Sequence, residues 1–203
     1  MLILTYLEYH SELIWSLGVM SEFIWTLIPG CILALMGFHS LDRLYYSSGI
    51  WLQFKPVCGL VVKVVAHQWY WSYEYCNYTS NNRLRYDSYI KPLPSLELGE
   101  YRLLDVDYRA IVPTAILTGL VVTSEDLLHS FTIPSLHTKI DANPARLNAR
   151  VLYFTIPGLY YGQCSELCGV NHSFMPILIE ATSITTLWLW HLLHSGLLSL
   201  YGY

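Results

Sequence analysis

The residues best suited to chemistry in this chain lie in one short segment toward its C-terminal end. Two thiols, one imidazole and one thioether fall within twelve residues, in the spacing C-x3-C-x3-H-x2-M: Cys164, Cys168, His172 and Met175. Thiolates, thioethers and imidazoles are ligands that copper prefers, whereas oxygen-rich sites favour magnesium or calcium. The residue types and their spacing therefore indicate a copper site.

A histidine earlier in the chain is the candidate for a further ligand. Cupredoxin copper sites combine one histidine from an earlier strand with cysteine, histidine and methionine from one later loop, and His129 is the candidate for the earlier one. A mononuclear site needs one cysteine, but here Cys164 and Cys168 are both present. Two thiolates can bridge two copper ions, each completed by one histidine. Met175 would then be a weak ligand to one ion, and a backbone carbonyl could serve the other.

Three other interpretations of these residues remain open. Cys164 and Cys168 could form a local disulfide. The two cysteines could instead bind zinc together with His172 and His129, because structural zinc sites are commonly Cys2His2, although Met175 is not expected in such a site. The four residues could also share this segment by coincidence.

The composition indicates a chain that is partly membrane-bound or buried in a larger assembly. Of its 203 residues, 54% are hydrophobic and 13% are charged, where an average soluble domain has about 25% charged residues. The mean hydropathy is +0.37. The formal net charge is −4, and the sequence has no basic patch that could neutralise phosphates. Nucleic acid is therefore excluded as an obvious partner. The other cysteines, Cys31, Cys58 and Cys76, show no recognisable ligand spacing.

One helix that spans a membrane is predicted near the N-terminus. No residue from Phe23 to Leu41 carries a formal charge, and a helix of this length, at about 1.5 Å per residue, nearly crosses the roughly 30 Å core of a bilayer. We predict the transmembrane helix over 22–45, with Pro29 kinking or loosening it. A buried core helix of a soluble protein is the alternative. Residues 1–21 are too short and too acidic to form a second independent span.

After Leu60 the pattern changes to short strands separated by turns. β-Branched and aromatic residues with partial alternation predict strands at 61–65, 69–75, 102–109, 116–123, 149–156 and 176–181. Turn-type residues fill the gaps at 77–82, 92–99, 124–126, 141–144 and 157–158. This arrangement is typical of an all-β sandwich or barrel. The aromatic and apolar tail, 183–203, could form an interfacial helix or a contact with another subunit.

Together these motifs resemble those of the cytochrome c oxidase subunit 2 family, the copper-bearing subunit of heme–copper terminal oxidases. The resemblance runs from about Glu22 to Ala181 and is carried by four stretches in the expected order: 67–75 (HQWYWSYEY), 124–131 (SEDLLHSF), 141–146 (DANPAR) and 158–176 (GLYYGQCSELCGVNHSFMP). It implies an all-β, cupredoxin-like Greek-key sandwich over 61–182, preceded by an N-terminal transmembrane α-helix.

The resemblance also implies a binuclear copper centre, called CuA, whose ligands all come from this chain. The ligands would be His129, Cys164, the main-chain carbonyl of Glu166, Cys168, His172 and Met175. The side chain of Glu166 would reach a magnesium ion at the boundary with the catalytic subunit, and a hard cation suits a carboxylate ligand. Trp69 would be the residue through which electrons enter. Without the family, the aromatic run at 69–71 indicates only strand packing.

The partners follow from the same resemblance. Cytochrome c would dock on an acidic face, because complementary potentials raise the encounter rate and set orientation; the acids at family positions are Glu74, Asp87, Asp107, Glu125 and Asp126. Glu22 would lie at the mouth of a proton path into catalytic subunit 1, although its side chain could equally reach the lipid headgroups. The membrane would be the mitochondrial inner membrane, with the copper domain in the intermembrane space, or the equivalent bacterial plasma membrane.

The chain departs from the family pattern at two places. The family normally has two spans before the copper domain, and only the second is evident here. The first is degenerate within 1–21, absent, or supplied by another polypeptide. After Tyr78 the family often has acids, whereas residues 79–85 read TSNNRLR. Docking would then be weaker or directed toward a differently charged partner.

We therefore expect a subunit of cytochrome c oxidase that takes electrons from cytochrome c at CuA and passes them to heme in the catalytic subunit, where oxygen is reduced. Three alternatives belong to other classes: the CuA domain of another reductase, such as nitrous oxide reductase; a metal-free structural oxidase subunit, as in quinol oxidases; and a copper carrier. The cysteines and histidines argue against the metal-free subunit. The predicted helix and the Trp69 motif favour the oxidase over the others.

Overall fold

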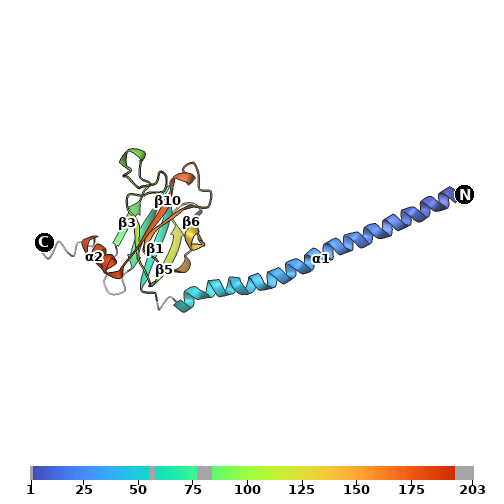
Figure 1. The fold of residues 1–203 in the computed structure, drawn as a ribbon, viewed down its shortest axis with the longest axis horizontal. Coiled ribbons are helices and arrows are strands. Elements are labelled where there is room, and N and C mark those ends of the chain that lie inside the picture. Colours follow the sequence, from blue (N-terminus) through green and yellow to red (C-terminus); the bar gives the residue numbers. More distant parts are fainter. Residues whose placement is uncertain (1, 55–57, 77–83, 195–203) are drawn as a thin grey trace. The chain divides into compact units, whose positions relative to one another are not determined.

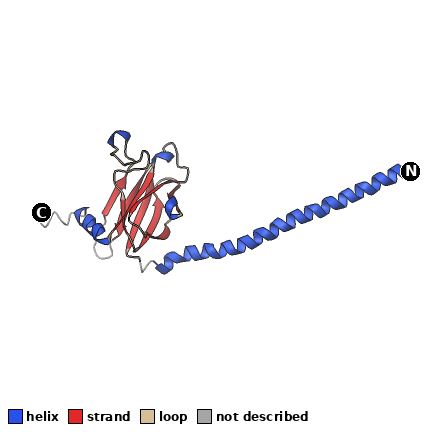
Figure 2. Cartoon of the chain, viewed as in Figure 1, coloured by secondary structure: helices blue, strands red, loops and turns tan. Residues whose placement is uncertain are grey.

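The chain consists of two compact units, which are residues 1–49 and residues 50–203. The computed structural model describes residues 2–54, 58–76 and 84–194. Figure 1 follows the chain through both units, and Figure 2 shows that one unit is helical and that the other consists mainly of strands. We describe each unit by itself.

The first unit is one long apolar helix. Helix α1 spans Leu2–Phe54 and continues through Pro29. Its segment Gly18–Tyr46 has a mean hydropathy of 1.8 and is long enough to cross a membrane, and every side chain of this segment is exposed. Helices that are apolar on all faces normally lie against lipid or protein. The segment is therefore a candidate membrane span that includes the predicted helix at 22–45, and residues 2–21 belong to the same helix.

The second unit is a sandwich of two five-stranded sheets. The first sheet has the order β3-β2-β1-β5-β8, with strands Leu84–Ser88, Tyr70–Cys76, Leu60–His67, Leu117–Ser124 and Asn148–Tyr153. The second has the order β4-β10-β9-β6-β7, with strands Ala110–Pro113, Pro176–Thr182, Gly158–Cys164, His129–Ile133 and Thr138–Ala142. The prediction of an all-β sandwich that follows an apolar helix is confirmed.

Side chains that alternate along the strands build the core between the two sheets. Along β1 the side chains in this core are Val62, Val64 and Ala66, and along β2 they are Trp71, Tyr73 and Tyr75. The second sheet contributes Phe131, Ile133, Ile177 and Ile179. Successive side chains of a strand point to opposite faces, so a slip of one residue would expose the whole buried set. The core therefore fixes the register of the strands, and with it the positions of the strand ends.

The strand predicted at 102–109 is wrong. Residues 102–104 form turns, and the buried carboxylate of Asp105 accepts the backbone N–H of Tyr101 at 2.5 Å. The guanidinium of Arg109 lies 3.7 Å from the same carboxylate. A side chain that bonds nearby backbone groups competes with sheet formation. The alternation of apolar and charged residues here therefore belongs to a loop that closes around Asp105.

Five strands have no clear pattern in the sequence: β3, β4, β6, β7 and β9. They are short or rich in polar residues and glycine; β9, for example, begins at Gly158 and contains Gly162. Strand β7 also includes the first part of the turn expected at 141–144. Strand conformation in such segments depends on pairing with neighbours. The turn predicted at 77–82, and most of the sequence departure at 79–85, lie outside the described residues.

The described part of the C-terminal tail is a helix packed against the sandwich. Helix α2 spans Ile184–His194. The ring of Trp190 lies 5.3 Å, centroid to centroid, from the ring of Tyr75, which belongs to the core. Residues 184–194 of the tail are thus helical and contact their own chain, and whether the helix also lies at a membrane surface or against another subunit stays a prediction; residues 195–203 lie outside the described part of the structure.

Candidate metal centre

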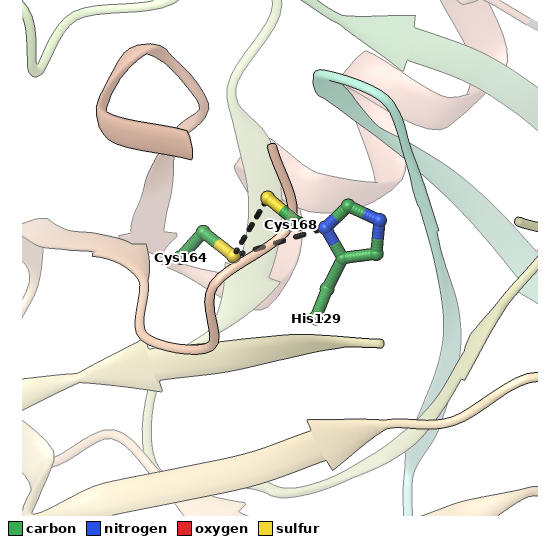
Figure 3. A group of neighbouring side chains, drawn as sticks. All are labelled: His129, Cys164 and Cys168. Carbon is green, nitrogen blue, oxygen red and sulfur yellow. Dashed lines mark hydrogen bonds between the residues drawn. The ribbon is translucent and has the colours of Figure 1, made fainter. Parts of the chain in front are cut away.

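Neighbouring strands of the second sheet bring several of the predicted ligands together. Strand β6 begins at His129, strand β9 ends at Cys164, and the two strands are antiparallel neighbours. His129 Nδ1 lies 3.8 Å from Cys164 Sγ (Figure 3). Strand β9 also pairs with β10, with Gln163 opposite Pro176, and this places Met175 across from Cys164. The fold therefore brings His129 to Cys164 and Met175, which lie far from it in the sequence.

The loop between β9 and β10 folds back so that the second thiol faces the first. Gly169 takes a φ of 118°, which residues with a Cβ rarely adopt, and the short helix η4, His172–Phe174, follows it. Cys168 Sγ lies 3.9 Å from Cys164 Sγ. It also lies 3.4 Å from His172 Nδ1 and 3.6 Å from Met175 Sδ. All the predicted ligand side chains therefore converge on one buried sulfur pair.

The separation of the two sulfurs bears on the disulfide interpretation. A disulfide bond has a length of about 2.03–2.05 Å, whereas Cys164 Sγ and Cys168 Sγ are 3.9 Å apart and both thiols are free. Two metal–sulfur bonds of about 2.3 Å each can span such a gap. The geometry argues against a local disulfide and fits a metal shared between the sulfurs.

The set of donor atoms is larger than one tetrahedral ion uses. His129, Cys164 and Cys168 alone place their ligand atoms within 4.8 Å of one another. The main-chain carbonyl of Glu166 adds an oxygen 3.4 Å from Cys164 Sγ, while His172 and Met175 lie beside Cys168. Each thiol thus has its own imidazole and a further, weaker donor. This division fits a pair of soft ions that share two thiolates better than a single zinc ion.

The two thiols do not give up their protons equally. Burial disfavours the thiolate of Cys164, but hydrogen bonds, led by that from His129, outweigh burial and lower its pKa. Burial and the nearby Cys164 both raise the pKa of Cys168. In the metal-free chain the first proton is therefore lost far more readily than the second. A cation between the sulfurs would offset the repulsion that holds the second proton.

The orientation of His129 is set by a carboxylate. Asp126 Oδ1 lies 2.9 Å from His129 Nε2, and the imidazole is fully buried. With a metal bound, a proton held on Nε2 by this carboxylate would leave Nδ1, which faces Cys164, free to bind the metal. The sequence pattern identifies Asp126 only as an acid of a docking face. Its position three residues before His129 is the signal that would indicate this bond.

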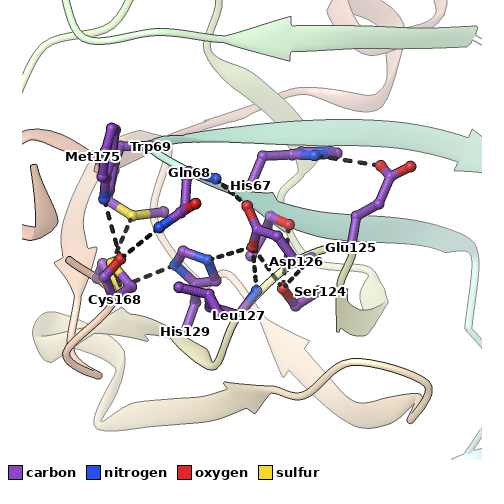
Figure 4. Close-up of polar contacts among 12 residues, drawn as sticks. His67, Gln68, Trp69, Ser124, Glu125, Asp126, Leu127, His129, Cys168 and Met175 are labelled. Carbon is purple, nitrogen blue, oxygen red and sulfur yellow. Dashed lines mark hydrogen bonds and ion pairs between the residues drawn. The ribbon is translucent and has the colours of Figure 1, made fainter.

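Trp69 and its neighbour contact the thiol loop directly (Figure 4). Trp69 is half-buried, and its indole N–H donates to the carbonyl oxygen of Cys168 at 3.2 Å. The side chain of Gln68 donates to the same oxygen at 3.1 Å. The φ of Gly169 favours glycine, and an added Cβ there would also lie 3.2 Å from the Trp69 ring, tighter than an ordinary contact. Nothing in the sequence pattern singles out Gln68.

The carboxylate of Glu166, the expected magnesium ligand, is exposed and lies near Lys139. Its side chain is 46% exposed and lies 3.9 Å from Lys139 Nζ, which also lies 3.5 Å from Asp141. Among the residues that the structure describes, no group of three metal-ligating side chains includes Glu166. A magnesium ion at this carboxylate would take its other ligands from a different chain or from water.

Two of the expected docking acids are bonded to other side chains of the sandwich. Glu74 is 8% exposed and lies 3.3 Å from Lys63 Nζ. Asp87 accepts a hydrogen bond from the Ser72 hydroxyl at 2.6 Å. The charge of Glu74 is largely compensated by Lys63, so this acid contributes little to the potential outside the chain.

Three of the expected docking acids are exposed on the sandwich: Asp107, Glu125 and Asp126. Glu125 pairs with His67 at 3.3 Å and is 66% exposed, and Asp126 combines its exposed position with the bond to His129. Glu22 belongs to the other unit, where its side chain is exposed on α1. The structure therefore leaves a smaller acidic group on the sandwich surface than the sequence predicts.

Comparisons with known proteins agree on one family. A family model described as cytochrome C oxidase subunit II, periplasmic domain, matches residues 60–182. The cytochrome c oxidase subunit 2 of Metridium senile is 47% identical over 176 residues, which cover 87% of this chain and 68% of that protein. The corresponding protein of Yponomeuta malinellus is 46% identical over 173 residues, which cover 85% of this chain and 72% of that protein.

A solved structure is similar over the sandwich. The crystal structure of the periplasmic domain of subunit II of cytochrome oxidase (CoxB) of Bradyrhizobium japonicum is 36% identical in sequence and superposes with a TM-score of 0.61. The match covers 68% of this chain and 95% of that domain. This likeness supports the expectation of a cupredoxin-like sandwich.

Proposed function

The chain belongs to the cytochrome c oxidase subunit II family, and we propose that it holds a binuclear copper centre, CuA, that accepts electrons for the oxidase. One observation carries the proposal: Cys164 Sγ and Cys168 Sγ are 3.9 Å apart, unbonded and buried, and each thiol has an imidazole nitrogen beside it. Soft donors in this number suit copper. When bound, the centre would supply one-electron redox chemistry shared over two ions.

The residues that would hold the copper pair are His129, Cys164, the carbonyl of Glu166, Cys168, His172 and Met175. Their own chemistry prepares the site. Asp126 holds the proton of His129 on Nε2, which leaves Nδ1 for metal binding. The thiol side chains are buried, so water has little access to them. Strands β6 and β9 carry two of the six donors, and Met175 directly precedes β10, which limits rearrangement between oxidation states.

We propose that the electron donor is cytochrome c and that electrons enter through Trp69. The indole is half-buried and bonds the carbonyl of a ligand residue, Cys168, so it lies between the surface and the sulfurs. Asp107, Glu125 and Asp126 would attract a basic partner, with Asp87 and Glu74 contributing less. Each electron taken from the donor would leave to heme in catalytic subunit 1, where oxygen is reduced.

The placement in a membrane is part of the same proposal. Segment Gly18–Tyr46 of α1 would cross the lipid bilayer, with Glu22 near its boundary at a proton path into the catalytic subunit. The membrane would be the mitochondrial inner membrane, with the sandwich in the intermembrane space, or a bacterial plasma membrane. The exposed carboxylate of Glu166 would bind magnesium at the contact with the catalytic subunit.

Electron paramagnetic resonance of the full chain, purified in detergent and loaded with copper, tests the proposal. One unpaired electron shared equally by two copper nuclei gives seven hyperfine lines, and we expect that pattern. The variant Cys168→Ser should lose it, because one thiolate cannot bridge two ions in the same way. A four-line signal from the unchanged chain, or a chain that takes up zinc and refuses copper, would contradict the proposal.

A further inference from the structure

Gln68 is exposed, yet it has one hydrogen bond to a proposed copper-ligand residue and one to the carboxylate that orients another. Its side-chain Nε2 donates to the carbonyl oxygen of Cys168 at 3.1 Å, where Trp69 Nε1 also donates. Its backbone N–H donates to Asp126 Oδ2 at 2.6 Å, and Asp126 Oδ1 bonds His129. Figure 4 shows both sets of contacts. One residue thus connects the loop that carries the thiols with the strand that carries the first histidine.

The two side-chain donors saturate one backbone oxygen of the thiol loop. A carbonyl oxygen has two lone pairs, and Gln68 and Trp69 supply one N–H each to the oxygen of Cys168. The carbonyl of Glu166, two residues earlier, lies instead 3.4 Å from Cys164 Sγ. The loop therefore presents the oxygen of Glu166 to the sulfurs. The oxygen of Cys168 is held by Gln68 and Trp69, which form the turn of the hairpin between β1 and β2.

The same donors act on the charge of the site. Each N–H presents the positive end of a dipole to the buried residue that carries the second sulfur, although both hydrogen bonds are only partly buried and Gln68 itself is exposed, which weakens the effect. A centre that gains an electron gains negative charge, and nearby hydrogen-bond donors stabilise that state. Removal of one donor should therefore make reduction less favourable.

We propose that Gln68 is a positioning residue of the copper centre: it holds the carbonyl of Cys168 away from the metal, so that Glu166 supplies the backbone ligand, and it raises the reduction potential. This inference rests on the proposed function. Gly169 is part of the arrangement, since an added Cβ there would lie 3.4 Å from Gln68 Nε2 and 3.2 Å from the Trp69 ring.

The test compares variants of the full chain, loaded with copper in detergent. Gln68→Met keeps the size of the side chain and removes the donor; Gln68→Glu also brings a negative charge toward the carbonyl of Cys168. Asn148→Leu is the matched control, because the Asn148 carboxamide donates to a backbone carbonyl, that of Asp141, outside the thiol loop. Titration with a chemical reductant such as dithionite, which supplies one electron to each centre through a mediator dye, measures the potential.

We expect the potential to fall from wild type to Gln68→Met and further to Gln68→Glu, with unchanged copper content, while the control matches wild type. The hyperfine pattern of Gln68→Met should also differ from that of wild type. A seven-line signal in wild type with equal potentials in wild type and Gln68→Met would overturn the inference alone. A wild-type chain without the seven-line signal would overturn the proposed function, and this inference with it.

A second measurement needs no copper. In the metal-free chain, amide hydrogen exchange of residues 165–170 reports whether the loop is held by the hairpin. We expect faster exchange in Gln68→Met than in wild type and in the control. Exchange that is the same in all three chains would show that Gln68 does not hold the loop, and this would overturn the inference even if the variants fail to load copper.

Discussion

The bond between Asp126 and His129 would let a single carboxylate act on the proposed copper pair without touching it. Asp126→Asn keeps the size of the side chain but loses its charge, and its amide can offer a donor to His129 Nε2, which favours the wrong tautomer. Loss of such outer partners typically lowers metal affinity by about 10- to 100-fold. We expect a loss in this range for copper, measured by competition with a chelator.

The neighbouring acid provides the control for that measurement. Glu125 is exposed and pairs with His67 rather than with a proposed ligand, so Glu125→Gln should leave copper affinity unchanged. Equal affinities of Asp126→Asn and wild type would show that the carboxylate does not support the imidazole.

Trp69 and Gln68 both donate to the carbonyl of Cys168. A comparison of variants at the two positions can therefore separate the proposed role of Trp69 in electron entry from the effect of its hydrogen bond. Trp69→Phe removes both the indole and the donor, whereas Gln68→Met removes only a donor to the Cys168 oxygen. We expect Trp69→Phe to slow electron transfer from reduced cytochrome c by more than tenfold in stopped-flow mixing, with copper content unchanged. If electron transfer slows equally in both variants, the hydrogen bonds to Cys168 and not the indole account for the effect. Loss of copper in Trp69→Phe would mean that Trp69 has a structural role.

Residue types and spacing predict the donor atoms of the candidate site but not the groups that orient them. Cys164, Cys168, His172 and Met175 share one loop, so their pattern is visible locally. Gln68 is 100 residues from Cys168 in the chain, and their bond exists only because β1 and β2 meet the loop in the folded sandwich. The periodicity of apolar residues along the sequence does not predict such a contact.

The elements that position the ligands depend on a close approach of two strands. Gly162 lies in β9, beside the pairing of β9 with β6, and an added Cβ would overlap the backbone carbonyl of Thr132 in β6. Gly162→Ala should push β6 away from β9 and so move His129 away from Cys164. Overpacking of this kind typically destabilises a fold by about 1–3 kcal/mol. We expect a lower urea midpoint and weaker copper binding.

Tryptophan fluorescence of the full chain follows the unfolding of Gly162→Ala. Gly37→Ala is its control, because an added Cβ at Gly37 meets nothing within 4 Å. If the two variants unfold at the same urea concentration as wild type, the approach of β6 to β9 does not limit the site.

At the scale of elements, strong local patterns predict strands and weak ones do not. β1, β2, β5 and β10 have runs of β-branched or aromatic residues that fill the core, and β8 adds Leu152 to it. β6 and β9, which carry His129 and Cys164, have no such run, and they become strands because the sheet supplies their partners. The alternation at 102–109 predicts a strand that does not form, because the buried carboxylate of Asp105 bonds its own local backbone.

For the whole molecule, the two units differ in what covers their apolar side chains. The sandwich buries its own between two sheets. In α1, Leu33, Leu35 and Phe38 are 67%, 65% and 75% exposed. Exposure of this much apolar surface to water is unfavourable at about 25 cal/mol per Å². We therefore infer that lipid or another chain covers α1 in the cell.

Charges at the centre of α1 distinguish lipid from water around it. A charged residue at the middle of a membrane helix costs roughly 2.5–3.5 kcal/mol, so Leu33→Asp with Leu35→Asp should prevent stable insertion. We expect the unchanged chain to stay in the membrane pellet after alkaline carbonate extraction and the double variant to appear in the supernatant. Leu93→Asp with Leu98→Asp, at exposed positions of the sandwich, should remain in the pellet. Extraction of the unchanged chain would mean that α1 is covered by protein at the membrane surface and not by lipid.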